Sequence, residues 1–168
     1  MQFKANQYFK NSYDYTSQKS INSFAKKLIN SSLKQECHED ILLVDPSYSN
    51  KPDIKKRSGR GFGYYLEKFY FGYDVNSSTL PDFPDVPLEL KTAGLKLRNT
   101  DYYSFYVKKE PRLTLSTIHN NEIIDEEFEN SSFFKKNNNL LIVFWLHDEL
   151  NTNQHPIDKE ILATFEYQ

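Results

Sequence analysis

The chain contains one cysteine, one methionine and one tryptophan among its 168 residues. A single cysteine, Cys37, excludes an internal disulfide and a cysteine-rich zinc site. Long hydrophobic runs are also missing: the longest, Leu140 to Leu146, has seven residues, whereas a membrane-spanning helix needs about 20. The first seven residues lack the apolar core of a secretory signal. We therefore expect a soluble intracellular protein.

An excess of charge of one sign is absent, because 21 lysines and arginines stand against 23 aspartates and glutamates, a net charge of −2. This balance argues only weakly against nucleic-acid binding, since nucleases combine a basic groove with acidic catalytic residues. Aromatic residues, at 15% of the chain, supply much of the burial that a modest aliphatic content cannot. The length suffices for a core, and we expect residues 1–168 to form a single domain.

Two stretches have the apolar spacing of helices. The first runs from about Ser17 to Lys34, and Thr16 or Ser17 can cap it. Its apolar positions are Ile21, Phe24, Ala25, Leu28, Ile29 and Leu33. The second runs from Gly63 to Phe71, with Gly72 as a C-terminal cap. A shorter helix is expected around residues 122–129, where acidic and apolar residues are interleaved.

The other apolar stretches are typical of strands. They are Val86 to Leu90, Tyr103 to Val107, Leu113 to Ile118, Leu140 to Leu146 and Ile161 to Tyr167. The continuous run from Leu140 is typical of a strand covered on both faces, and Asn137 to Asn139 predict a turn before it.

Residues 81–91 carry the clearest chemical signal. Glu89 and Lys91 lie two apart on a predicted strand, so their side chains point the same way, with Asp82 just upstream. Carboxylate oxygens suit Mg²⁺, which takes one or two protein carboxylates and completes its shell with water and phosphate. A neighbouring lysine can orient or activate the attacking water. These are the components of metal-assisted phosphodiester hydrolysis.

Each of these residues has a competing interpretation. Two acids and a lysine at such spacing occur by chance in many proteins. Asp85 competes with Asp82 but lies four residues before Glu89 rather than seven, and the spacing favours Asp82. Glu67 lies on the second predicted helix, and a glutamate on a helix is more often a surface residue than a metal ligand.

A basic segment precedes the second predicted helix. Its cations are Lys51, Lys55, Lys56, Arg57 and Arg60. Glycines among them let the backbone approach a ligand, and the cations could meet phosphates; the alternative is a solvated basic loop. His119-Asn120-Asn121 hints at an HNH nuclease, but a second histidine in the required context is missing.

The stretch from about Gly59 to Lys91 resembles the MutH family, which contains a mismatch-repair endonuclease that nicks at GATC and Sau-type type II restriction enzymes that cut there. The segments that carry the resemblance are Gly61–Glu67, Phe71–Asn76, Pro81–Phe83 and Leu88–Thr92. Phe71-Gly72-Tyr73 is closer to the Sau-type enzymes. Weaker similarity extends the match to roughly residues 55–147.

The resemblance implies a role for each residue of the predicted site. Asp82 and Glu89 correspond to the metal-binding carboxylates, with the Leu90 carbonyl as a further ligand. Lys91 corresponds to the lysine that positions the nucleophilic water. Glu67 corresponds to a helix glutamate that completes the site through a second metal or its waters.

DNA contacts are assigned to the basic segment and to one later lysine. Lys55, Lys56, Arg57 and Arg60 are the expected phosphate contacts. Lys109, next to Lys108, matches a further lysine near the scissile phosphate.

The implied fold is the α/β restriction-endonuclease core of the PD-(D/E)xK type, a mixed central sheet flanked by helices. The implied activity is that of a type II site-specific deoxyribonuclease of the bacterial cytoplasm, which cuts double-stranded DNA at GATC with Mg²⁺, or with Mn²⁺ as a substitute. Two alternatives are a catalytically silent DNA-binding or regulatory domain and an interaction domain unrelated to DNA.

The Sau-type relatives are longer and carry a second, C-terminal MutH-like domain. We therefore expect a catalytic fragment of a longer enzyme, a monomer or DNA-induced dimer whose isolated chain has weak sequence specificity.

Overall fold

A computed structural model of the chain describes residues 13–37, 61–73, 80–99, 104–108, 127–148 and 154–167. Five strands form one sheet in the order β1-β5-β4-β2-β3. They are β1 (Ser31–Ser32), β2 (Glu89–Asn99), β3 (Ser104–Lys108), β4 (Leu140–Leu146) and β5 (Glu160–Tyr167). β2 and β4 are parallel and the other neighbouring pairs are antiparallel. The sheet is therefore mixed.

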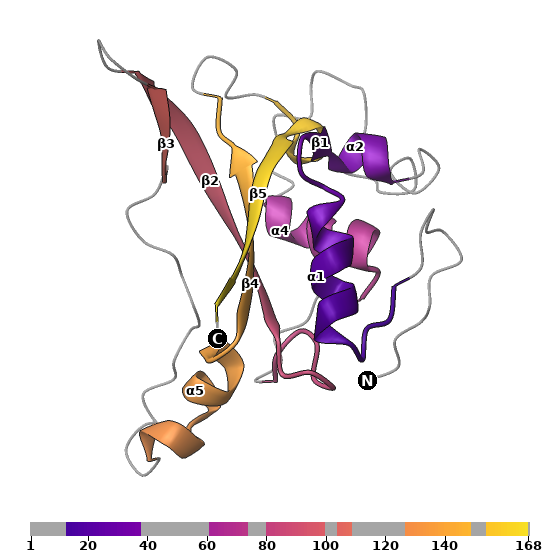
Figure 1. Cartoon of the computed structure of the whole chain (residues 1–168), viewed down its shortest axis with the longest axis vertical. Coiled ribbons are helices and arrows are strands. Elements are labelled where there is room, and N and C mark those ends of the chain that lie inside the picture. Colours follow the sequence, from indigo (N-terminus) through magenta and orange to yellow (C-terminus); the bar gives the residue numbers. More distant parts are fainter. Residues whose placement is uncertain are drawn as a thin grey trace.

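Short helices flank this sheet. They are α1 (Gln18–Lys26), α2 (Leu33–Glu36), α4 (Phe62–Tyr65), the π-helix η1 (Leu66–Phe71), the 3-10 turns η3 (Phe128–Asn130) and η4 (Pro156–Asp158), and α5 (Ser132–Asn137). Figure 1 shows α1, α2 and α4 on one side of the sheet and α5 beyond the start of β4. The expected α/β architecture is confirmed. None of the described helices is long and apolar enough to cross a membrane.

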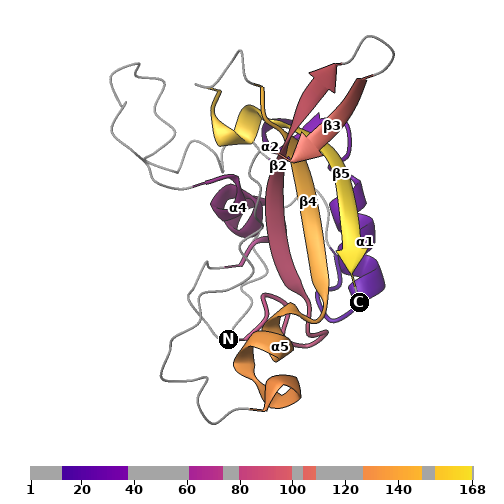
Figure 2. The same cartoon turned by 90° about the vertical axis from the view of Figure 1, so that its left-hand side faces the viewer.

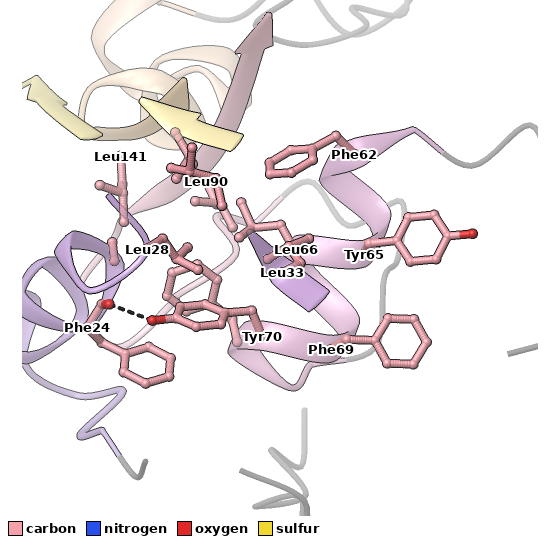
Figure 3. Packing of buried hydrophobic residues seen from close by; sticks show 14 of the residues in the cluster. Phe24, Leu28, Leu33, Phe62, Tyr65, Leu66, Phe69, Tyr70, Leu90 and Leu141 are labelled. Atoms are coloured by element: carbon pink, nitrogen blue, oxygen red, sulfur yellow. Dashed lines mark hydrogen bonds between the residues drawn. The ribbon is translucent and has the colours of Figure 1, made fainter. Parts of the chain in front are cut away.

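The main hydrophobic core lies between the sheet and the helices on that side. Phe24 of α1 stacks on Tyr70 of η1 with ring centroids 4.3 Å apart, and the Tyr70 hydroxyl donates to the Phe24 carbonyl at 2.7 Å (Figure 3). Leu90 and Leu141 reach this core from β2 and β4. Because each fully buried leucine stabilises the fold by about 1.5–3 kcal/mol, these contacts fix β2 against the helical layer.

The first helix is shorter than the apolar spacing predicts. It starts after Ser17 as expected but ends at Lys26, not Lys34. Asn30 adopts the left-handed conformation with φ 63°, which asparagine tolerates better than most residues, and its N–H donates to the Ile161 carbonyl at 2.8 Å. β1 then pairs with β5. Leu33 is buried although it follows the end of α1, so the apolar spacing identified this core residue correctly.

The strand predicted at Val86 to Leu90 is displaced, because β2 starts at Glu89 and Val86 lies in a turn. The strands predicted at Tyr103, Leu140 and Ile161 are confirmed to within one residue. The predicted turn at Asn137 is wrong by one residue, since α5 includes it. The predicted strand at 113–118 and most of the predicted acidic helix lie outside the described residues.

Candidate active site

A tight hairpin before β2 brings Asp82 beside Glu89. The Phe83 N–H donates to the Leu88 carbonyl at 3.0 Å and the Leu88 N–H donates back at 3.2 Å. The Val86 N–H donates to the Phe83 carbonyl at 3.3 Å within the turn. Because Phe83 and Leu88 are antiparallel partners, the next opposed positions are Asp82 and Glu89. The seven-residue spacing of the two acids is therefore what this hairpin requires.

Two hydrogen bonds hold the carboxylates of the hairpin in place. The Asp82 N–H donates to Glu89 Oε2 at 3.2 Å, and the Leu90 N–H donates to Asp82 Oδ2 at 2.9 Å. Each acid is thus oriented by the backbone of the opposite strand. Asp85, the competing acid, is exposed at the tip of the same hairpin.

Two lysines contact the same oxygen of Glu89. Lys91 Nζ lies 2.6 Å from Glu89 Oε1 and Lys136 Nζ lies 3.7 Å from it, while the Glu89 side chain is only 3% exposed. Lys136 comes from α5, which Figure 2 shows at the end of the sheet where β4 begins. The site therefore brings together Asp82, Glu89 and Lys91, as the sequence predicts, and adds a lysine that the sequence analysis missed.

Lys136 could be found from the sequence only if the pairing of β2 with β4 were known. Parallel strands begin at the same edge of a sheet, so residues just before Leu140 lie beside Glu89 once β2 and β4 are parallel neighbours. The pairing of these strands could not be read from either strand alone.

Glu67 approaches the cluster from the π-helix. Its carbonyl accepts the N–H groups of Gly72 at 2.8 Å and Tyr73 at 3.2 Å, and Gly72 has φ 79°, confirming the predicted glycine cap. π-helical turns occur often at functional sites because they redirect side chains. A Cβ placed on Gly63 would lie 3.7 Å from Glu67 Oε1 and 3.5 Å from Thr92 Oγ1, so the Glu67 carboxyl lies close to β2, the strand that carries Glu89 and Lys91.

Two carboxyl groups of the site have raised pKa values. Burial, and then the charges of Asp82 and Glu89, raise the pKa of Glu67 to about 7. Burial, and then Glu89, raise the pKa of Asp82 to about 6, although the Leu90 N–H, Lys91 and Lys136 oppose this rise. The two lysines therefore do not offset the burial of Asp82 and Glu67, and an added cation would favour the ionised forms of these two carboxyls.

The donor set fits a hard cation such as Mg²⁺. Among the described residues, no three histidine, cysteine, aspartate or glutamate side chains are placed to hold a metal ion together. Mg²⁺ needs only one or two protein carboxylates, because water and substrate phosphate fill its other positions. The carboxylates of Asp82 and Glu89 and the Leu90 carbonyl offer oxygen atoms of this kind.

The predicted DNA contacts Lys55, Lys56, Arg57, Arg60 and Lys109 lie outside the described residues. They stay predictions. Of the other residues considered, Cys37 is buried, and its thiol lies 3.5 Å from the Phe69 carbonyl in the core.

A family model described as "DNA mismatch repair enzyme MutH" matches residues 71–168, more than half of the chain. The match contains Asp82, Glu89, Lys91 and Lys136, whereas Glu67 precedes it. No curated protein sequence matches the chain. The fold, with its mixed five-stranded sheet and flanking helices, is consistent with the family's restriction-endonuclease-like fold. The chain belongs to the family of the DNA mismatch repair enzyme MutH.

Proposed function

We propose that this chain is a Mg²⁺-dependent endonuclease domain that hydrolyses phosphodiester bonds of double-stranded DNA, with GATC as its target. The observation that carries the proposal is the register pair of Asp82 and Glu89, with Lys91 Nζ 2.6 Å from Glu89. Membership of an endonuclease family supports nuclease activity and DNA binding in general. To this family membership the proposal adds a requirement for Mg²⁺, GATC as the target and type II character.

Each residue of the cluster has a distinct task in this mechanism. Asp82, Glu89 and the Leu90 carbonyl would hold the metal, which when bound supplies Lewis-acid stabilisation of the charge on the phosphate and the leaving 3′-oxygen. Lys91 would orient the attacking water, and its positive charge favours loss of the water's proton. Lys136 would face the phosphate and attract its negative charge.

The alternative is a DNA-binding domain without catalytic activity. One observation favours it: Lys91 and Lys136 already neutralise part of the charge on Glu89, and an ion-paired acid can serve stability alone. The two functions differ in their response to Mg²⁺, because only the nuclease cleaves DNA when Mg²⁺ is added.

Plasmid cleavage tests the proposal. The wild-type chain is incubated with supercoiled plasmid, with and without GATC sites, in Mg²⁺ or Mn²⁺, and the cut ends are mapped. We expect metal-dependent cuts, and losses of more than about 10²-fold in Glu89→Gln and Lys91→Ala, because transition-state stabilisation is removed. Metal-free DNA binding should stay largely intact.

Asp85→Asn is the matched control, since Asp85 lies on the same hairpin but is exposed. It should cut like the wild type. A Lys91→Ala protein that cuts at the wild-type rate would refute the mechanism. Because the isolated chain is expected to have weak sequence specificity, the target is judged on the mapped ends, and cut ends with no preference at all for GATC would refute it.

A further inference from the structure

Gln18, the first residue of α1, and Asn139, the last residue before β4, form a reciprocal pair of amide hydrogen bonds. Gln18 Nε2 donates to Asn139 Oδ1 at 3.3 Å, and Asn139 Nδ2 donates to Gln18 Oε1 at 3.2 Å. Gln18 Nε2 also donates to a carboxylate oxygen of Glu166 on β5. Because an ionised carboxylate only accepts hydrogen bonds, Glu166 fixes which way the Gln18 amide faces and so the polarity of the pair.

This pair is connected to the candidate active site through the main chain. The Asn139 carbonyl accepts the Glu89 N–H at 3.0 Å. Three residues earlier along the chain, Lys136 places its Nζ 3.7 Å from Glu89 Oε1. Asn139 therefore lies where the helix that bears Lys136 meets the strand next to Glu89.

We propose that Gln18 and Asn139 are positioning residues for the nuclease site, an inference that rests on the function proposed above. They act by holding the backbone of Glu89 and the approach of Lys136 to it. The separation of 3.7 Å already exceeds a normal hydrogen bond, so a small shift of the junction between α5 and β4 would remove this contact. α1, which contributes no side chain to the cluster, thereby sets the geometry of the acid.

Substitution of the pair tests this role. Gln18→Ala, Asn139→Ala and the double variant are compared at saturating Mg²⁺ over a range of duplex DNA concentrations. We expect each single variant to lower kcat about tenfold with KM for DNA nearly unchanged, because misplaced groups lose transition-state interactions. The double variant should be no slower than the singles, since both substitutions break one unit.

Gln154→Ala is the matched control. Gln154 Nε2 donates to the Asp158 carbonyl at 2.9 Å, ahead of the start of β5 and thus at the opposite end from Glu166. This variant should lose similar thermal stability with unchanged kcat. The proposal is overturned if Gln18→Ala and Asn139→Ala behave like Gln154→Ala, or if their effects on kcat multiply in the double variant.

Amide hydrogen exchange gives a readout that needs no cleavage. The Glu89 amide should exchange about tenfold faster in Gln18→Ala and Asn139→Ala, while the His147 amide, bonded to the Leu95 carbonyl at 2.6 Å, stays unchanged. Unchanged exchange at Glu89 would overturn the inference. If the wild type cuts no DNA but Glu89 exchange responds as stated, the nuclease proposal fails while the positioning of Glu89 stands.

Discussion

The chemistry of the site begins with acids that are hard to ionise. Asp82 and Glu67, with pKa values raised to about 6 and about 7, hold their protons more tightly in the folded chain than in the unfolded chain. At these two positions the folded state then binds more protons, so the contribution of Asp82 and Glu67 to the free energy of unfolding falls as the pH rises from about 4 to 8. A divalent cation would remove this penalty, because it stabilises the ionised carboxylates.

Lys136 and Lys135 offer a matched test at the scale of single residues. Lys136 is half-buried and lies 3.7 Å from Glu89, whereas its neighbour Lys135 is exposed. We predict that Lys136→Ala lowers the cleavage rate about 10²-fold, as expected when one charge that faces the transition state is lost. Lys135→Ala should leave the rate within about twofold, since an exposed cation contributes mainly to screened, non-specific attraction.

Single-turnover cleavage of a labelled duplex measures both rates. Equal rates for the two variants would show that the proximity of Lys136 to Glu89 has no part in catalysis.

At the scale of elements, the site depends on the parallel contact of β2 with β4. Gly94 of β2 lies against Trp145 of β4, and a Cβ at Gly94 would come within 2.8 Å of the indole. Trp145 also contacts Phe62 at a ring distance of 5.8 Å and Lys159 at 4.3 Å, so it cannot move without losing these contacts. The Trp145 indole can lie over β2 at this position only because residue 94 has no side chain.

We predict that Gly94→Ala lowers the free energy of unfolding by about 1–3 kcal/mol through overpacking. Gly61→Ala is the control, because a Cβ there meets nothing within 4 Å, and it should change stability by less than about 0.5 kcal/mol. Urea denaturation measures both. A Gly94→Ala protein as stable as the wild type would mean that the indole is free to move.

At the scale of the whole molecule, local features were predictable and long-range pairings were not. Asp82 and Glu89 could be found from sequence because they lie on one short hairpin, which places them opposite each other. Lys136 could not, because its place depends on the parallel pairing of β2 with β4, whose partner residues are 51 positions apart in sequence. The early end of α1 was missed for the same reason, since Asn30 bonds to Ile161 near the other end of the chain.

The central claim is that Asp82 and Glu89 form a cation site, and calorimetric titration with Mn²⁺ tests it most directly. At pH 8 the carboxyls of Asp82 and Glu67 are ionised in spite of their raised pKa values. The wild type should then bind Mn²⁺ and release few protons. At pH 5.5, below the pKa values of about 6 for Asp82 and about 7 for Glu67, binding should be at least about tenfold weaker. Asp82→Asn, which keeps an acceptor for the Leu90 N–H, should lose the site. Wild-type affinity in Asp82→Asn, or no binding at pH 8, would contradict the account.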